Sequence, residues 1–207
     1  MLVLVACEVS GRIRDAFIER GHDAYSCDLL TAQGKYPEKH IQANAIQVAH
    51  CRKWDLMIAH PECTYLSSSG LHWNQRTFGR CVQTRDAIIF AEILWKADID
   101  KICIENPVGC LPTHSNLMKY SQIIQPYNFG EDASKATCLW LKNLPLLKDT
   151  KYFPPRITKT GKKRWGNQTD SGQNKLGPSG KRAAERSITY QGIANAMAEQ
   201  WGDYGLV

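Results

Sequence analysis

The chain has 207 residues, of which 43% are hydrophobic and 22% are charged, a composition typical of one soluble globular domain. No apolar run approaches the roughly 20 residues that a helix needs to cross a bilayer, so we expect no membrane partner. The eight cysteines form no CxxC pair, which argues against a metal site and predicts free thiols in a reducing cytoplasm. The apolar start lacks a preceding basic stretch, so we expect a strand there and no signal peptide.

Apolar runs that suit strands alternate with amphipathic runs that suit helices along most of the chain. In chain order we expect a strand over 2–7, a helix over 11–21, strands over 23–30 and 54–60, a helix over 84–97, strands over 100–106, 121–130 and 135–144, and a helix over 190–201. This alternation predicts an α/β fold with a mostly parallel sheet covered by helices on both faces.

Positive charge is concentrated in residues 151–186. This segment holds ten Lys or Arg and only two acidic residues, a net charge of +8, whereas the chain as a whole carries +6. Its five glycines and three prolines indicate a loop or a small insert, too short for a second domain. A local basic patch is the usual mark of a polyanionic partner such as DNA. The alternative is a solvated, mobile loop that binds nothing in particular.

The loops that follow the predicted strands are the places where a ligand is expected, because ligands of such sheets bind outside the carboxyl ends of the strands. Four of these loops read CEVSGR, CDLL, HPECTYLSSSG and ENPVG. The first has a small-residue turn, Ser10-Gly11, leading into a helix, and suits an anionic or zwitterionic group, although a plain strand-to-helix turn explains it equally. The second ends in Asp28, whose carboxylate suits ribose hydroxyls.

The third and fourth loops carry reactive side chains. Cys63 follows a buried strand, where an ordinary half-buried cysteine is the simpler interpretation. Glu105 ends the next strand beside apolar neighbours, where burial can keep a carboxyl partly protonated and so able to donate a proton. Its alternative role is to cap a turn.

As an ordered pair, these two loops resemble the DNA (cytosine-5) methyltransferases, and most closely their short phage-type members. Cys63, Ser67 and Gly70 keep the spacing of the family's catalytic loop, and ENPVG resembles its Glu-Asn-Val motif. GIANAMA, through Asn195 and Ala196, resembles its Gly-Asn-Ala-Val motif. The resemblance implies a Rossmann-like fold of the S-adenosylmethionine-dependent methyltransferases, acting on DNA in the cytoplasm of a bacterial host.

The resemblance also implies a reaction and a set of roles. Cys63 would attack carbon 6 of cytosine, while Glu105, with Asn106 beside it, would protonate or hydrogen-bond ring nitrogen 3, so that carbon 5 takes the methyl group of S-adenosylmethionine. The residues at positions that match the cofactor pocket are Glu8, Ser10, Gly11, Arg12, Asp28, Asn44, Pro61 and Asn195. Those expected to contact nucleic acid, from the resemblance or from charge, are Ser67, Lys135, Lys162, Lys163, Arg164, Lys181 and Arg182.

The same comparison divides the chain into a catalytic core over 1–150, a reduced target-recognition insert over 151–186, and a C-terminal helix over 187–207 that returns to the core. The sequence departs from the family's motifs at two notable places. Glu62 precedes the nucleophile where the family has a neutral residue, and its charge is expected to oppose ionisation of the thiol. The first loop also lacks the family's glycines. Two further hypotheses follow: a non-catalytic, anti-restriction DNA-binding relative, and a methyltransferase acting on free nucleotide or single-stranded nucleic acid.

Overall fold

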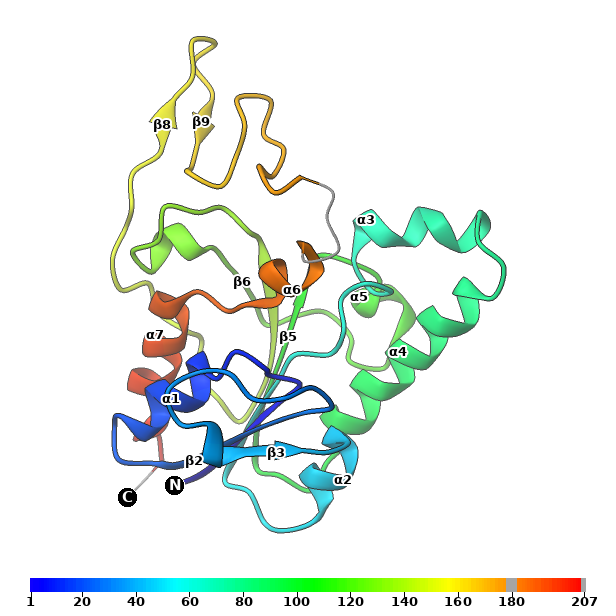
Figure 1. The fold of residues 1–207 in the computed structure, drawn as a ribbon, viewed down its shortest axis with the longest axis vertical. Helices are drawn as coiled ribbons and strands as arrows, with labels where there is room; N and C mark the ends of the chain where they lie inside the picture. Colours follow the sequence, from blue (N-terminus) through cyan, green and yellow to red (C-terminus); the bar gives the residue numbers. More distant parts are fainter. Residues whose placement is uncertain (178–181, 206–207) are drawn as a thin grey trace.

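A seven-stranded sheet forms the centre of the molecule in the computed structural model, which describes residues 1–177 and 182–205, without the side chains of 182–184. The strand order is β3-β2-β1-β4-β5-β7-β6 (Figure 1). Strands β1 to β5 pair in parallel, and β7 runs antiparallel to β5 and β6. The strands are β1 (Leu2–Ala6), β2 (Asp23–Asp28), β3 (His40–Gln42), β4 (Leu56–Ala59), β5 (Lys101–Pro107), β6 (Gln122–Ile124) and β7 (Thr137–Lys142). The predicted Rossmann-like α/β fold is confirmed.

Helices connect the strands, and a small two-stranded ribbon lies outside the sheet. The helices are α1 (Arg12–Ile18), α2 (Ala45–His50), α3 (Ser68–Leu71), α4 (Arg80–Trp95), α5 (Leu111–His114), α6 (Arg182–Ser187) and α7 (Gln191–Gly202), with 3-10 turns η1 (Pro37–Lys39), η2 (His72–Gln75) and η3 (Pro126–Asn128). The ribbon is β8 (Arg156–Ile157) with β9 (Lys163–Arg164). The sequence did not predict β3, α2, α3 or α5, because such short elements carry too little periodicity.

Two separate hydrophobic cores cover the two faces of the sheet. Because side chains alternate along a strand, Leu4 and Ala6 point to the core shared with α2 and α4, whereas Val3 and Val5 point to the core shared with α1 and α7. All four side chains are fully buried. This two-sided burial explains why the central strands read as continuous apolar runs.

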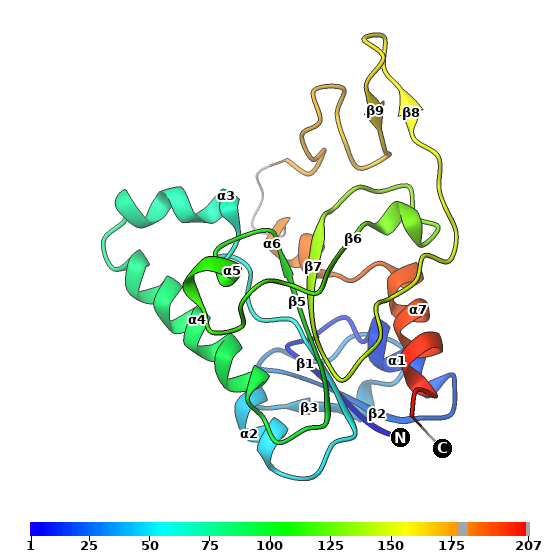
Figure 2. The same cartoon turned by 180° about the vertical axis from the view of Figure 1, so that it is seen from behind.

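Helix α7 returns from the end of the chain to pack beside α1 (Figure 2). Its start is held closely against the segment before β7: a Cβ at Gly192 would lie 1.9 Å from the carbonyl oxygen of Phe129, so only glycine fits. The Gly192 amide donates to Glu131 Oε1 at 2.9 Å. Helix α7 is therefore part of the core layer beside the site described below.

The basic segment packs on the core through an aromatic contact. Trp165 stacks on Tyr127 with ring centroids 4.0 Å apart, and its Nε1 donates to the Phe153 carbonyl at 3.1 Å. The Gly166 amide donates to Asp132 Oδ1 at 2.6 Å. Figure 1 shows the β8–β9 ribbon projecting beyond the sheet, on the side where the strands of the parallel set end. The part of the segment that the structure describes is thus anchored at its base.

The packing of α1 gives a stability prediction. Phe17→Ala should lower the free energy of unfolding by about 3–5 kcal/mol, because it leaves a cavity between α1, α7 and the sheet. Phe17 is 0% exposed, whereas Phe78 is fully exposed and provides a matched control. Phe78→Ala should change the stability by less than about 0.5 kcal/mol. Urea unfolding followed by circular dichroism measures both, and equal losses would contradict the described packing.

Candidate active site at the ends of the parallel strands

Glu105 and His60 meet because of the register of two neighbouring strands. Ala59, the last residue of β4, pairs with Ile104 of β5, so the next residues, His60 and Glu105, lie side by side. They continue the face of the sheet that α1 and α7 cover. His60 Nδ1 forms a hydrogen bond and an ion pair with Glu105 Oε2. No sequence pattern assigned a role to His60, although it stands in the same strand-end loop as Cys63.

This contact corrects the expected state of Glu105. Burial raises the pKa of a carboxyl group, but the charge and hydrogen bond of His60, with a smaller effect of Lys135, outweigh burial and lower the pKa of Glu105 to about 2. The expectation of a partly protonated Glu105 is therefore wrong for the free protein. For His60 the two effects have the opposite signs. Burial lowers its pKa, but the negative charges of Glu105 and Glu8 outweigh burial, and the net result is a raised pKa.

Cys63 lies in the same charged neighbourhood. Its side chain is partly buried, and its carbonyl accepts hydrogen bonds from the amides of Leu66 and Ser67 at 3.2 and 3.0 Å. Burial is the main cause of a raised pKa for the thiol; Glu105 raises it further, whereas Lys135 and Arg186 lower it. Glu62, by contrast, has an exposed side chain. The neutral thiol is therefore favoured by burial and by Glu105, and not mainly by Glu62 as the sequence suggested.

Asn106 holds the loop that carries the cysteine. Its side chain is 1% exposed, and its Nδ2 donates to the carbonyl oxygen of Pro61 at 2.7 Å. Its Oδ1 is buried, and no described residue donates a hydrogen bond to it. The structure thus gives Asn106 a positioning contact, and it ties Pro61 to the end of β5.

The loops after β4 and β5 are also joined directly. A Cβ at Gly109 would lie 1.9 Å from the carbonyl oxygen of Leu66, and the Cys110 amide donates to that oxygen at 2.9 Å. Ser68 donates to the Val108 carbonyl through both its amide and its hydroxyl, each at 3.0 Å. These contacts after Cys63, with that of the Asn106 side chain to Pro61 before it, hold the loop that carries Cys63 against the chain that follows Glu105.

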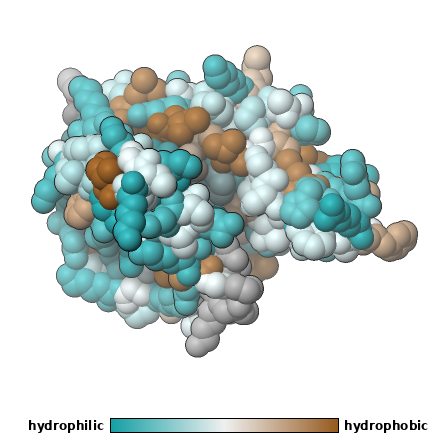
Figure 3. All heavy atoms as spheres, turned by 90° about the horizontal axis from the view of Figure 1, so that it is seen from above, coloured by the Kyte–Doolittle hydropathy of each residue, from teal (hydrophilic) through white to brown (hydrophobic). Residues whose placement is uncertain are grey.

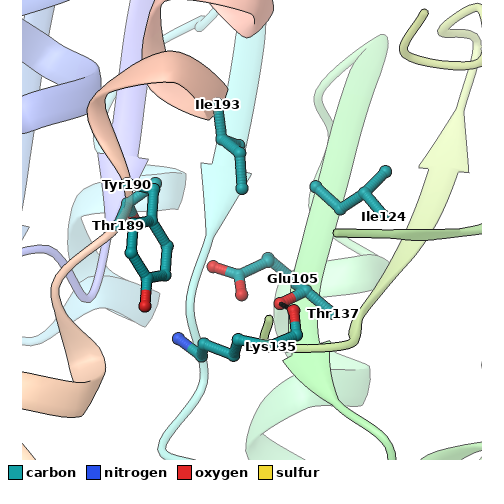
Figure 4. Close-up of a pocket in the computed structure, with 7 residues that line it drawn as sticks. All are labelled: Glu105, Ile124, Lys135, Thr137, Thr189, Tyr190 and Ile193. Atoms are coloured by element: carbon teal, nitrogen blue, oxygen red, sulfur yellow. Dashed lines mark hydrogen bonds between the residues drawn. The ribbon is translucent and has the colours of Figure 1, made fainter. Parts of the chain in front are cut away.

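A small cavity opens beside Glu105. Figure 4 shows the Glu105 carboxylate, the Lys135 amine and the Tyr190 hydroxyl turned toward it. The other lining residues are Ile124, Thr137, Thr189 and Ile193. Lys135 Nζ donates to the carbonyl oxygen of Arg186 at 2.9 Å. Lys135, expected as a nucleic-acid contact, thus lies among the charged groups of the site.

The loop after β1 already places a buried carboxyl group at the start of α1. The buried Glu8 carboxylate accepts from the Ile13 amide at 2.9 Å and the Ser10 hydroxyl at 3.2 Å through Oε1, and from the Arg14 amide at 3.4 Å through Oε2. Burial raises the pKa of Glu8. The amides of Ile13 and Arg14 are therefore already used by the chain's own carboxyl group, so an anionic or zwitterionic ligand group at this turn would need other contacts, such as Ser10 and Arg12.

The other residues expected to contact a cofactor lie either in a cleft beside α1 and α7 or at the ends of the strands. Ser10, Arg12 and Asn195 line a cleft of about 460 Å³ along α1 and α7. Asp28 and Asn44 lie at other points of the strand ends: Asp28 Oδ1 accepts from the Leu30 amide at 3.0 Å, and Asn44 Oδ1 caps α2 by accepting from the Ile46 amide at 2.9 Å.

Two exposed apolar side chains follow Asp28 and were missed by the sequence analysis. Leu29 is 71% exposed and Leu30 is 64% exposed, next to the carboxylate at the end of β2. The signal was available in the letters CDLL, but a pattern of apolar residues does not reveal which of them face solvent. A carboxylate beside exposed apolar groups can bind a ligand that has both hydroxyls and a flat apolar ring.

The residues expected to contact nucleic acid differ in how freely they face solvent. Lys162 and Lys163 are exposed, whereas Arg164 donates to the Asp170 carbonyl at 3.1 Å through Nε and to the Lys163 carbonyl at 2.8 Å through Nη1. Ser67 bridges to Gly109 near Cys63. Lys181 lies outside the described residues, as does the side chain of Arg182. Figure 3 views this end of the molecule and shows a central hollow with both hydrophilic and hydrophobic residues around it.

Within the described ranges, no helix is both long and apolar enough to cross a membrane. No group of three or more His, Cys, Asp or Glu side chains that could hold a metal ion occurs in that part of the chain.

Comparison with known proteins adds a structural match. No protein-family model matches the sequence, and no curated protein matches it. Among solved structures, the fold is similar to that of a proposed DNA modification methyltransferase encoded within a prophage of E. coli, with a TM-score of 0.50 and 12% sequence identity. The match covers 75% of this chain and 52% of that one, so the chain spans about half the length of the matched structure. At this identity, what the two proteins share is the fold.

The environment of Cys63 predicts how its thiol responds to nearby charge. Lys135→Met should raise the pKa of Cys63 further, because it removes a cation that favours the thiolate. Alkylation by iodoacetamide, measured as a function of pH by mass spectrometry of the Cys63 peptide, should then require a higher pH.

Two variants serve as controls. Lys53→Met removes an exposed lysine that follows α2, and it should leave the alkylation profile of Cys63 unchanged. Glu62→Gln should move the profile only slightly, because solvent screens an exposed charge. A Glu62→Gln shift larger than that of Lys135→Met would contradict this account.

Proposed function

We propose that this protein transfers a methyl group from S-adenosylmethionine to carbon 5 of cytosine in DNA, with Cys63 as a covalent nucleophile. The observation that carries the proposal is that Cys63, in the loop after β4, lies within the electrostatic influence of Glu105 in β5 and Lys135 before β7, two residues that line one cavity. Covalent addition to a pyrimidine needs a nucleophile, a group that handles a proton and a countercharge, and these three side chains supply them. The fold shared with the prophage protein supports the same class of activity.

Cys63 would act as its thiolate. Its sulfur forms a bond to carbon 6 of the ring, and the added electron density makes carbon 5 nucleophilic. Lys135 and Arg186 favour the ionised sulfur, and the thiol proton passes to solvent before the attack. In duplex DNA the target base must first leave the stack to reach a half-buried cysteine.

The end of β2 fits the adenosine part of the proposed cofactor. Asp28 keeps one oxygen on the Leu30 amide, so its other oxygen is placed to accept from ribose hydroxyls, and the exposed Leu29 and Leu30 suit the adenine ring. Ser10, Arg12 and Asn195 are the proposed contacts of the methionine end. When bound, the cofactor supplies the electrophilic methyl group.

Two variants test the proposal together. Cys63→Ser should abolish methylation of cytosine-containing DNA and leave S-adenosylmethionine binding unchanged, because the proposed cofactor contacts lie on other loops. Asp28→Ala should weaken cofactor binding by about 1–3 kcal/mol, because a charged acceptor is lost. Isothermal calorimetry measures the binding, and transfer of a labelled methyl group to DNA measures the activity.

A trapping experiment provides the decisive outcome. DNA containing 5-fluorocytosine should form a covalent adduct with the parent protein in the presence of the cofactor, because fluorine at carbon 5 does not leave as a proton does. The adduct should map to the Cys63 peptide and be absent from Cys63→Ser. Undiminished methylation by Cys63→Ser would exclude covalent catalysis by this residue.

The basic segment is proposed to contact the DNA backbone. Binding should weaken with salt, with a slope of about −0.9 in log salt for each phosphate contacted on duplex DNA. Replacing the exposed Lys162 and Lys163 with Met should reduce the slope and weaken binding to all sequences alike. Arg156 makes an ion pair with Asp170 inside the segment, so Arg156→Met with Asp170→Asn is a charge-neutral control. Fluorescence anisotropy over a salt series measures the slope; an unchanged slope would refute this role.

The second proposal is that the protein binds DNA without catalysis. The pKa shifts of Cys63 and Glu105 favour it. The raised pKa of Cys63 keeps the free thiol neutral, and the lowered pKa of Glu105 leaves it without its own proton. A protein that binds the cofactor and DNA but gives no adduct at any pH would have this function.

A further inference from the structure

We infer that His60 is a positioning residue that stores the proton which Glu105 passes to ring nitrogen 3 of the target base. This inference rests on the proposed cytosine addition and assigns a part of it that Glu105 alone does not provide. The observation behind it is the direct contact between His60 Nδ1 and Glu105 Oε2.

The contact is built into the sheet. His60 follows β4, and its amide donates to the Ala6 carbonyl at 3.0 Å, which fixes its backbone against β1. Glu105 lies within β5, which is hydrogen-bonded to β4 on one side and to β7 on the other. The two side chains are 12% and 13% exposed, so water has little access to the proton that they share.

Charges on several elements favour a protonated imidazole. Glu105 faces it from β5 and Glu8 from the loop after β1, and both carboxylates raise its pKa; Lys135, before β7, opposes them. His60 Nε2 is buried and has no hydrogen-bond partner among the described residues. The imidazole of His60 thus lies near two carboxyl groups and one amine. The raised pKa of His60 and the lowered pKa of Glu105 favour the ring as the site of the proton that this hydrogen-bonded pair shares.

This arrangement lets Glu105 act as a relay although its own pKa is low. As the Cys63 sulfur bonds to carbon 6, the π electrons of the ring shift and nitrogen 3 becomes more basic. Glu105 then gives a proton from one oxygen to nitrogen 3 and takes a proton from His60 Nδ1 on the other. When the carbon–sulfur bond breaks, with loss of the carbon-5 proton to water, the nitrogen-3 proton returns through Glu105 to His60.

The first arm of the test needs no activity. In ¹⁵N-labelled parent protein, the imidazole nitrogens of His60 should titrate above the ordinary value for histidine, and Glu105→Gln should move the midpoint to lower pH. His60→Gln identifies the resonance by its disappearance, and the exposed His50, at the end of α2, is a reference in the same spectra. A His60 midpoint at or below the ordinary value, or one that Glu105→Gln leaves in place, would overturn the inference.

The second arm connects the proton to the reaction. The profile of kcat/KM against pH reports ionisations of the free protein, so one of its limbs should coincide with the His60 midpoint seen by NMR. His60→Gln should move that limb to lower pH, because the remaining acid is a carboxyl group, and should reduce the maximal rate by about 10–100-fold. His50→Gln should leave the profile unchanged. If urea unfolding shows that His60→Gln has lost stability, His60→Asn takes its place.

The outcomes separate this inference from the proposed function. A parent that forms the 5-fluorocytosine adduct while His60→Gln keeps the whole pH profile would overturn the role of His60 alone. A parent that shows the protonated pair by NMR but forms no adduct at any pH would overturn the proposed function, and the proton delivery with it. The expected result is that the NMR midpoint of His60 and one limb of the kinetic pH profile coincide, and that His60→Gln moves this limb whereas His50→Gln does not.

Discussion

The parallel pairing of β4 with β5 is the constraint on which the site depends. Because Ala59 pairs with Ile104, the chain must place residues 60 and 105 side by side, on the face covered by α1 and α7. A slip of one strand by one residue would turn its side chain to the opposite face of the sheet and separate the two residues. The apolar strands, buried on both faces, specify this register through packing, and the ion pair between His60 and Glu105 is its chemical consequence.

The site concentrates opposite charges in a volume with little water. Carboxylates from the ends of β1 and β5, the imidazole of His60 and the amine of Lys135 influence one another strongly because burial removes the solvent that would screen them. The same burial raises the pKa of the Cys63 thiol. The protonation state of each group in this site therefore depends on the charges of the other groups.

Several structural contacts involve residues that were expected to hold a ligand. Glu8 binds the free amides of α1, Asn44 caps α2, and Asn106 holds the carbonyl of Pro61. Polar side chains at strand ends face two demands at once, because the loops there leave backbone groups that need partners. Sequence spacing locates such residues but does not distinguish a side chain that satisfies the chain itself from one that is available to a ligand.

The sequence by itself determined the α/β class, the order of the long elements, the basic segment and the loops in which Cys63 and Glu105 lie, because periodicity and charge are properties of local runs of residues. The tertiary structure decided which residues meet. His60 and Glu105 are 45 positions apart, and only strand register brings them together. The charge states of Glu105 and Cys63 were likewise decided by burial and by partners from other elements, which no local pattern of residues contains.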